Sequence, residues 1–170
     1  MKYTMSVLVE NRAGVLSKVS GLFSRRGFNI DSLVVGVTED PTISRMTIVV
    51  DGDDYTVEQV EKQLNKLIPI IKVKTLTAGT FIPRVLSMIK IGVGTEQRAD
   101  IMRITELMNA RIVDVTRTSM TIEFTDTPER TETLESLLRP YGIREAVRTG
   151  VIAVEKGADP IRRVGRQTGL

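Results

Sequence analysis

Apolar and polar residues alternate at the start of the chain, between Tyr3 and Glu10. This period of two predicts a β-strand with one buried face. The alternation stops at residues 11–14, and apolar residues then recur with the period of a helix: Val15, Leu16, Val19, Leu22 and Phe23. The pattern therefore predicts a strand, a short loop and an amphipathic helix. Gly27 can end this helix, because glycine readily adopts the left-handed conformation that helix ends require.

Four more elements are predicted in the first half of the chain. Residues 28–37 and 43–50 are rich in β-branched residues and predict two strands, joined by a turn at 38–41. Apolar residues with helical spacing then predict a second helix, namely Val57, Val60, Leu64 and Leu67. Residues 68–76 predict a fourth strand, so the order of elements is β-α-β-β-α-β.

The second half of the chain repeats this order. Strand patterns occur at 84–93, 111–116, 119–125 and 143–154, and helical patterns at 96–109 and 128–139. Thr127 is a favourable N-cap for the second of these helices, and Pro128 suits its first position. The sequence SRMTIVV at 44–50 also resembles TSMTIEF at 118–124. The chain is therefore predicted to contain two copies of one structural unit.

Two such units predict an α+β fold with two ferredoxin-like βαββαβ domains in tandem. We expect a first domain at 1–77, a linker at 78–83, a second domain at 84–157 and a flexible basic tail at 158–170. In each domain, two helices would cover one face of a four-stranded sheet and leave its other face and its edges open. Open edges favour pairing with another sheet, so we expect an oligomer.

The composition excludes several kinds of chemistry. The 170 residues include neither Cys nor His, which rules out disulfides, thiolate metal sites, Cys nucleophiles and His-dependent triads. An enzyme of this composition would depend on carboxylates, Lys or Tyr, and turnover by the purified chain alone would be its test. The acids Asp51, Asp53 and Asp54 lack the spacing of a calcium loop, and we expect them to cap the helix that follows.

Charge and hydropathy bear on the partners. The net charge is only +3 and aromatic residues make up 4% of the chain, whereas nucleic-acid-binding proteins usually show a basic stripe or stacking aromatics. No apolar run approaches the length that spans a bilayer, and the N-terminus lacks the pattern of a signal peptide. We therefore expect a cytoplasmic protein that binds neither nucleic acid nor membranes.

The loop before the first helix is the clearest candidate for a ligand site. Gly14 allows a ligand to approach the backbone closely, and the first N–H groups of the helix, near Val15 and Leu16, have no intrahelical acceptor. With the helix dipole, they favour a carboxylate or a phosphate. Asn11 and Asn29 each offer a donor and an acceptor, so they could hold the ends of an amino acid. In the structural alternative, Asn11 only caps the helix and Gly14 only turns the chain.

Longer stretches of the sequence resemble a known family. They are VLVENRAGVLSKVSGLFSRRGFNIDSL, TEDPTISRMTIVV and EQVEKQLNKL in the first half, and RIVDV and RPYGIREAVRTGVIAV in the second. Together they resemble the small regulatory subunit of acetolactate synthase, also called acetohydroxyacid synthase, from Tyr3 to about Gly157. The NxxGVL corner alone would indicate only an ACT domain, which is a widespread amino-acid-sensing module.

The resemblance implies that the first domain is an ACT domain and that two copies pair through it as a homodimer. A feedback inhibitor, typically valine, would bind between them. One subunit would contact it through Asn11, Ala13, Gly14, Val15 and Leu16. The paired subunit would contribute Asn29 and Ile30. The chain has Arg12 and Ala13 where the family is expected to have acidic or proline-like residues, and this difference could change the affinity for the ligand.

The resemblance also implies that the chain is not itself catalytic. It would bind the large, thiamine-diphosphate-dependent subunit of acetolactate synthase, raise its activity and confer feedback inhibition in branched-chain amino acid biosynthesis. Thiamine diphosphate, Mg and FAD would belong to the large subunit, and this chain would carry no cofactor and no metal. The alternative is a stand-alone ACT-domain sensor that regulates transcription or another metabolic enzyme.

Overall fold

The computed structural model describes residues 1–161, which form two compact units. Unit 1 consists of Met1–Ile82 together with the segment that begins at Val151, and unit 2 is Pro83–Gly150. Each unit has the order and sheet of a βαββαβ domain, which confirms the predicted α+β class. Most of the predicted basic tail, residues 162–170, lies outside the described residues. No helix within residues 1–161 combines the length and the hydropathy needed to cross a bilayer.

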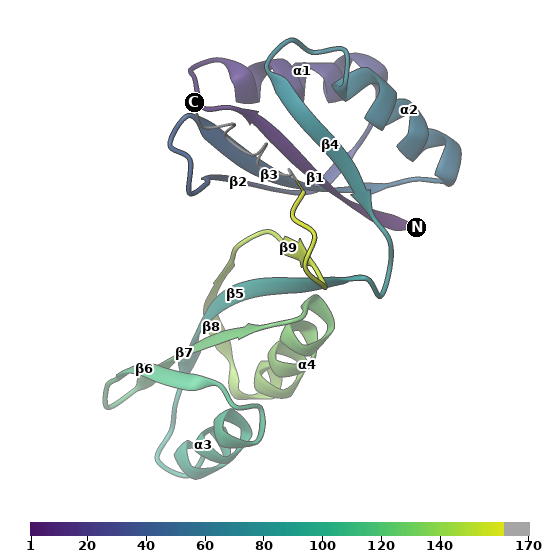
Figure 1. Cartoon of the computed structure of the whole chain (residues 1–170). Coiled ribbons are helices and arrows are strands. Elements are labelled where there is room, and N and C mark those ends of the chain that lie inside the picture. The colour runs from purple at the N-terminus through teal and green to yellow at the C-terminus, as the bar shows by residue number, and fades with distance from the viewer. Residues whose placement is uncertain (162–170) are drawn as a thin grey trace. The chain divides into compact units, whose positions relative to one another are not determined.

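Unit 1 has two helices on one face of a four-stranded antiparallel sheet (Figure 1). Its elements are β1 (Lys2–Glu10), α1 (Val15–Arg26), β2 (Ile30–Val37), β3 (Ile43–Asp51), α2 (Asp54–Leu64) and β4 (Ile70–Leu76). The strand order is β2-β3-β1-β4, which makes β2 and β4 the edge strands. β4 begins two residues later than predicted, because the chain turns at Pro69 and the Ile70 N–H donates to the carbonyl of Leu67 (3.0 Å).

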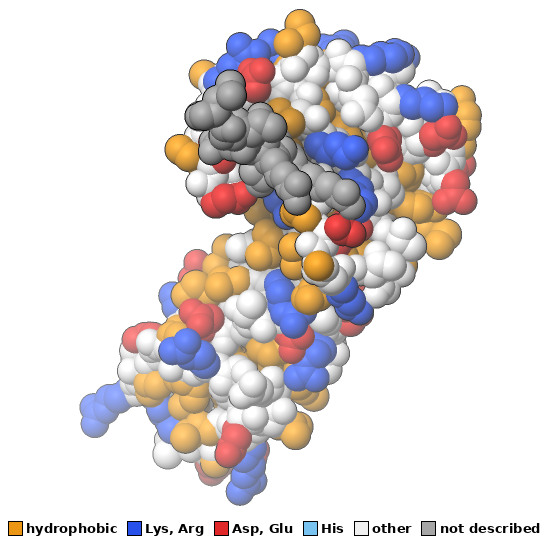
Figure 2. All heavy atoms as spheres, viewed as in Figure 1, with side chains coloured by type: hydrophobic (Ala, Val, Ile, Leu, Met, Phe, Trp, Pro, Cys, Tyr) orange, Lys and Arg blue, Asp and Glu red, His pale blue; other side chains and the backbone are white. Residues whose placement is uncertain are grey.

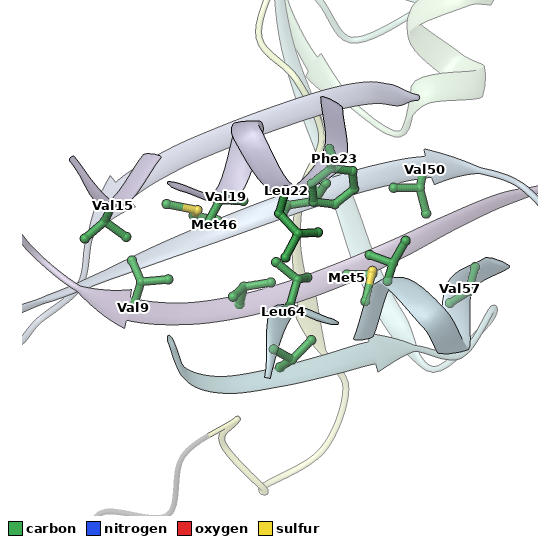
Figure 3. Close-up of a cluster of buried hydrophobic side chains, with 14 residues drawn as sticks. Met5, Val9, Val15, Val19, Leu22, Phe23, Met46, Val50, Val57 and Leu64 are labelled. Atoms are coloured by element: carbon green, nitrogen blue, oxygen red, sulfur yellow. The ribbon is translucent and has the colours of Figure 1, made fainter. Parts of the chain in front are cut away.

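The core of unit 1 fills the space between the sheet and the helices (Figure 3). Alternate residues of β1 face the helices, and the apolar stripe of α1 lies over them. The buried residues from these two elements are Met5, Val7, Val9, Val15, Val19, Leu22 and Phe23. Leu16, which belongs to the same predicted stripe, is exposed instead. The periodicity thus identified the core correctly but assigned it one residue that faces solvent.

Gly27 ends α1, as the sequence predicts. It is left-handed (φ +68°), its N–H donates to the carbonyl of Ser24 (3.3 Å), and the next N–H, of Phe28, donates to that of Phe23 (3.0 Å). These two bonds form a Schellman motif, which satisfies carbonyls at the end of a helix. The rings of Phe23 and Phe28 meet edge to face, with centroids 6.3 Å apart, and supply the apolar contact that accompanies this motif.

Two glycine substitutions in α1 should therefore change stability in opposite directions. Gly27→Ala places a Cβ at a positive φ, and we expect a loss of about 1 kcal/mol in the free energy of unfolding. Gly21 lies inside the helix, where an added Cβ would meet only the flexible end of Arg25 at 3.4 Å, so Gly21→Ala should gain about 0.5 kcal/mol. Urea unfolding of both variants is the measurement. Equal effects of the two substitutions would contradict this account of the helix end.

Unit 2 repeats the arrangement of unit 1. Its elements are β5 (Phe81–Gly92), α3 (Arg98–Leu107), β6 (Arg111–Val115), β7 (Ser119–Asp126), α4 (Pro128–Leu138), the 3-10 turn η1 (Arg139–Tyr141) and β8 (Ile143–Arg148). The strand order is β6-β7-β5-β8. The predicted cap of α4 is confirmed, because Thr127 Oγ1 accepts a hydrogen bond from the Arg130 N–H (3.4 Å) and Pro128 is the first helical residue. β5 begins at Phe81, inside the stretch that the sequence predicts as a linker.

The prediction of one last strand over 143–154 is wrong. The structure has β8, which ends at Arg148, and a separate strand β9 (Ile152–Glu155), which pairs with β5. Between them, the N–H of Thr149 donates to the carbonyl of Leu86 (2.9 Å), and its Oγ1 accepts from the N–H of Leu86 (3.1 Å). Two residues later, from Val151 onward, the chain belongs to unit 1. The contacts therefore divide the chain differently from the expected second domain at 84–157.

Candidate functional site

The start of α1 presents backbone N–H donors to which no described side chain is hydrogen-bonded. Gly14 precedes the helix in the left-handed conformation (φ +82°, ψ −6°), and no side chain among residues 1–161 caps the helix. The first intrahelical bond runs from the Lys18 N–H to the carbonyl of Gly14 (3.1 Å), so the N–H groups of Val15 and Leu16 have no acceptor within the helix. The first turn contains no acidic side chain. Free donors and the positive end of the helix dipole together favour an anion here.

Asn11 does not cap α1, contrary to the structural alternative. Its backbone N–H donates to the carbonyl of Thr42 (2.7 Å), and its side-chain Nδ2 donates to the carbonyl of Pro41 (2.8 Å). Both bonds connect the loop before α1 to the turn between β2 and β3. This bond uses one of the two Nδ2 hydrogens, so Asn11 can still offer a ligand its side-chain oxygen and one N–H. A carbonyl oxygen suits an ammonium group.

The backbone at Gly14 is open to solvent. Within the described part of the chain, a Cβ added to it would meet nothing within 4 Å, so a ligand could approach this point closely. Ala13 and Leu16 are exposed beside it. Val15 differs, because its side chain is only 4% exposed and belongs to the core. Of the predicted contacts, Val15 could therefore contribute its N–H but not an apolar wall, which would be left to Ala13 and Leu16.

An ion pair balances the charge of the loop. Arg12 Nε lies 2.6 Å from a carboxylate oxygen of Glu10, and the Arg12 N–H donates to the carbonyl of Glu10 (3.0 Å). Without Arg12, Glu10 would be an unpaired anion close in sequence to the helix start and would repel a ligand carboxylate. Arg12 is one of the two positions at which the sequence departs from the expected family pattern. The pair leaves the loop without net negative charge.

Asn29 and Ile30 follow the C-terminal end of α1, whereas the other predicted contacts lie at or just before its N-terminal end. The helix has 12 residues and is therefore about 18 Å long. A free amino acid is too short to reach both ends. Within one chain the structure thus brings together the predicted residues before and at the helix start, and it leaves Asn29 and Ile30 apart from them. A complete site would need a second copy, placed so that the start of one α1 lies near the end of the other.

An exposed apolar edge lies next to this site, and the sequence reasoning did not single it out. Val35 and Val37 of β2 are 41% and 59% exposed, and Leu16 of α1 is 46% exposed. Val35 pairs with the buried Met46 of β3 and so lies on the face of the sheet that carries the helices. β2 is an edge strand. The sequence indicates this edge through its apolar residues at 33, 35 and 37, which lie on one face of the strand. α1 leaves the last two of them exposed.

Asp51, Asp53 and Asp54 each form a hydrogen bond with another group of unit 1. Asp53 caps α2 by accepting a hydrogen bond from the Thr56 N–H (2.7 Å), and bonding with Thr56 lowers the pKa of this carboxyl. Within residues 1–161, no group of three or more acids is arranged to hold a metal ion. On the face shown in Figure 2, basic and acidic side chains are interspersed over both units. The predicted capping of α2 is confirmed for Asp53 and is wrong for Asp51 and Asp54, which bind the N-terminal ammonium of Met1 and the Tyr3 hydroxyl instead.

Two family models match the chain. One, described as an AHAS small subunit-like ACT domain, matches residues 5–72, and one described as the small subunit of acetolactate synthase matches residues 84–157. A probable acetolactate synthase small subunit of Archaeoglobus fulgidus is 52% identical over 92% of this chain and 98% of its own length. The acetolactate synthase small subunit of Mycolicibacterium smegmatis is 50% identical over 91% of each chain.

A solved structure agrees with these matches. The crystal structure of the acetolactate synthase small subunit from Thermotoga maritima superposes with a TM-score of 0.88 at 37% identity. The match covers 94% of this chain and 99% of that one. The similarity therefore extends over both units.

Proposed function

The chain belongs to the family of acetolactate synthase small subunits, and from this premise we propose that it activates a catalytic large subunit and makes it sensitive to feedback inhibition by valine. The ACT domain is the part that would sense the amino acid. We place thiamine diphosphate, Mg and FAD on the large subunit and the whole complex in the cytoplasm. The reaction would then be catalysed by the large subunit alone, and this chain would set its rate.

One observation supports the sensing site above all others, namely the uncapped start of α1 behind Gly14. The N–H groups of Val15 and Leu16 would bind the ligand carboxylate, as donors backed by a helix dipole commonly do. The side-chain oxygen of Asn11 would accept from the ammonium group. Ala13 and the exposed Leu16 would contact the short branched side chain.

The same proposal requires a homodimer. Asn29 and Ile30 cannot reach the start of their own α1, so we assign them to the paired subunit. The exposed apolar residues of β2 and α1, Leu16, Val35 and Val37, favour an interface at this edge. Inhibition then follows from linkage. Valine shifts the complex toward its less active arrangement by the difference between its affinities for the two arrangements.

An activity assay tests this function. Acetolactate formation by a large subunit should rise several-fold when this chain is added, and valine should reverse the rise in a saturable manner. Leucine and isoleucine, titrated in parallel, show which branched-chain amino acid the complex senses. A chain that neither stimulates nor binds a large subunit in a pull-down would contradict the proposal and favour a stand-alone sensor.

A further inference from the structure

Residues 151–155, called the strap here, cross the face of the unit 1 sheet that carries no helix. The N–H of Val151 donates to Ser32 Oγ on β2 (3.0 Å), and Arg45 Nη2 on β3 donates to the carbonyl of Ala153 (2.7 Å). Lys74 on β4 forms an ion pair with Glu155 (2.6 Å). The sequence predicted an open face in this position, and that expectation is wrong for unit 1.

The strap has the alternation of a strand with one buried side. Residues 151, 153 and 155 make the contacts with the sheet, and Ala153 is buried. Ile152 and Val154, between them, are each 52% exposed. Successive side chains of a strand point to opposite sides, so this pattern shows that one side of the strap fits the sheet. The docking is therefore specific rather than a loose passage of chain.

Two effects on the charged guanidinium of Arg45 oppose each other where the strap docks. Burial lowers the pKa of the Arg45 guanidinium, and the charges of Glu155 and then of Glu39 oppose this effect. Arg45 Nε has no hydrogen-bond partner within residues 1–161. A partly buried guanidinium loses hydration, which costs free energy. The hydrogen bond to the Ala153 carbonyl and the charge of Glu155 compensate for only part of this cost. An element held by such compensating contributions can have two states of similar free energy.

The strap contacts the strands that lead to the candidate ligand site. Ser32 on β2 lies three residues after Asn29 and two after Ile30, directly after a register shift between Ile30 and Ser32. Arg45 lies three residues after Thr42, whose carbonyl accepts the hydrogen bond from the Asn11 N–H. Asn29 and Ile30 thus lie within three residues of a strap contact along the chain, and Asn11 is hydrogen-bonded to a residue that lies three residues from another.

The strap also begins at one of the two points where the chain passes from one unit to the other. These connections are Ile82–Pro83 and Gly150–Val151. The second follows directly on the anchor of Thr149 to Leu86 in unit 2. Just after the strap, the Lys156 N–H and Nζ donate to the carbonyls of Thr80 (2.9 Å) and Gly79 (2.8 Å), which holds it against the first connection.

We propose that the strap is the relay of the effector signal: ligand binding at the ACT site stabilises the docked strap, and the docked strap transmits inhibition through its covalent continuation into unit 2. The proposal rests on the proposed function, because it requires an effector at that site. The proposal assigns ligand binding to the ACT site and transmission of inhibition to the strap. A weakened strap should therefore leave the ligand site intact and impair inhibition.

The test uses the complex of large and small subunits with the double variant Arg45→Met and Glu155→Gln. Met retains much of the aliphatic stem of Arg45, and Gln retains the shape of Glu155. The expected result is at least a tenfold rise in the valine concentration for half inhibition, with unchanged stimulation. Valine binding to the small subunit, measured by calorimetry, should weaken by no more than the factor by which valine slows exchange in the strap, because the two effects are reciprocal. Glu58→Gln, which breaks the Glu58–Lys62 pair (2.6 Å) on α2, is the matched control and should behave as the parent chain.

Hydrogen exchange in the parent complex tests the same proposal without any substitution. Valine should slow exchange of the backbone amides at 152–155 at least threefold. Unchanged exchange, or a double variant that valine inhibits as fully as the parent, would overturn the role of the strap. A parent chain that binds no branched-chain amino acid would instead overturn the proposed function, and the strap relay with it.

Discussion

Gly14→Asp should give a complex that is fully stimulated and no longer inhibited by valine. The added carboxylate would lie at the start of α1, where the ligand carboxylate is proposed to bind, and the two anions would repel each other. We expect the valine concentration for half inhibition to rise at least about 30-fold, which corresponds to about 2 kcal/mol. Acetolactate assays across a valine titration, with calorimetry of the small subunit, would measure this.

Gly14→Asn is the matched control for this substitution. Gly14 has a φ of +82°, so any side chain strains the backbone, and Asp and Asn both tolerate this region comparatively well. An added Cβ would meet no atom of residues 1–161 within 4 Å. Asn reproduces the size and strain of Asp without its charge, so it should retain most of the inhibition. If both variants are as sensitive as the parent, the ligand does not bind at this helix start.

The double substitution Val35→Asp and Val37→Asp should separate the proposed dimer into monomers. Both side chains are exposed on the edge strand β2 of the isolated chain, so the fold should tolerate the change. In a two-fold dimer, four carboxylates would be desolvated close to one another, which costs several kcal/mol. We expect the dimer dissociation constant to rise at least about 100-fold, equivalent to about 2.7 kcal/mol.

Sedimentation over a concentration series would measure the dissociation, and calorimetry would report valine binding in parallel. Binding should be lost together with the dimer, because Asn29 of the second copy is proposed to complete the site. Ile68→Asp is the control: Ile68 is 87% exposed, but it lies in the turn between α2 and β4, away from the β2 edge. A double variant that remains dimeric and binds valine would show that β2 is not the interface.

The candidate site was only partly predictable. The spacing around Gly14 predicted a helix start with free donors, because caps depend on a few neighbouring residues. It did not predict that the Asn11 side chain would donate to the carbonyl of Pro41, 30 residues away. Nor did it separate Val15, which is buried, from Leu16, which is exposed. A helical stripe shows which side of a helix is apolar, but not where the neighbouring strands stop covering it.

The helix boundaries and the last predicted strand also differ in whether their causes are local or distant in sequence. Gly27 and the Thr127–Pro128 cap act within one turn of a helix, so their effects could be predicted from adjacent residues. The strand predicted over 143–154 contains no such local break. Its interruption depends on Leu86, which binds Thr149, and on Arg45, which lies 108 residues from Ala153.

The sequence by itself determined the two βαββαβ units, most of their cores and the glycine-marked corner, because hydrophobic periodicity and helix caps are local properties of the chain. It also carried the resemblance that the family matches confirm. Only the tertiary structure decided that the Asn11 side chain donates to the carbonyl of Pro41 and that residues 151–155 return to cover the sheet of unit 1. Both outcomes depend on contacts between residues distant in sequence, whose distances and hydrogen bonds exist only once the chain has folded.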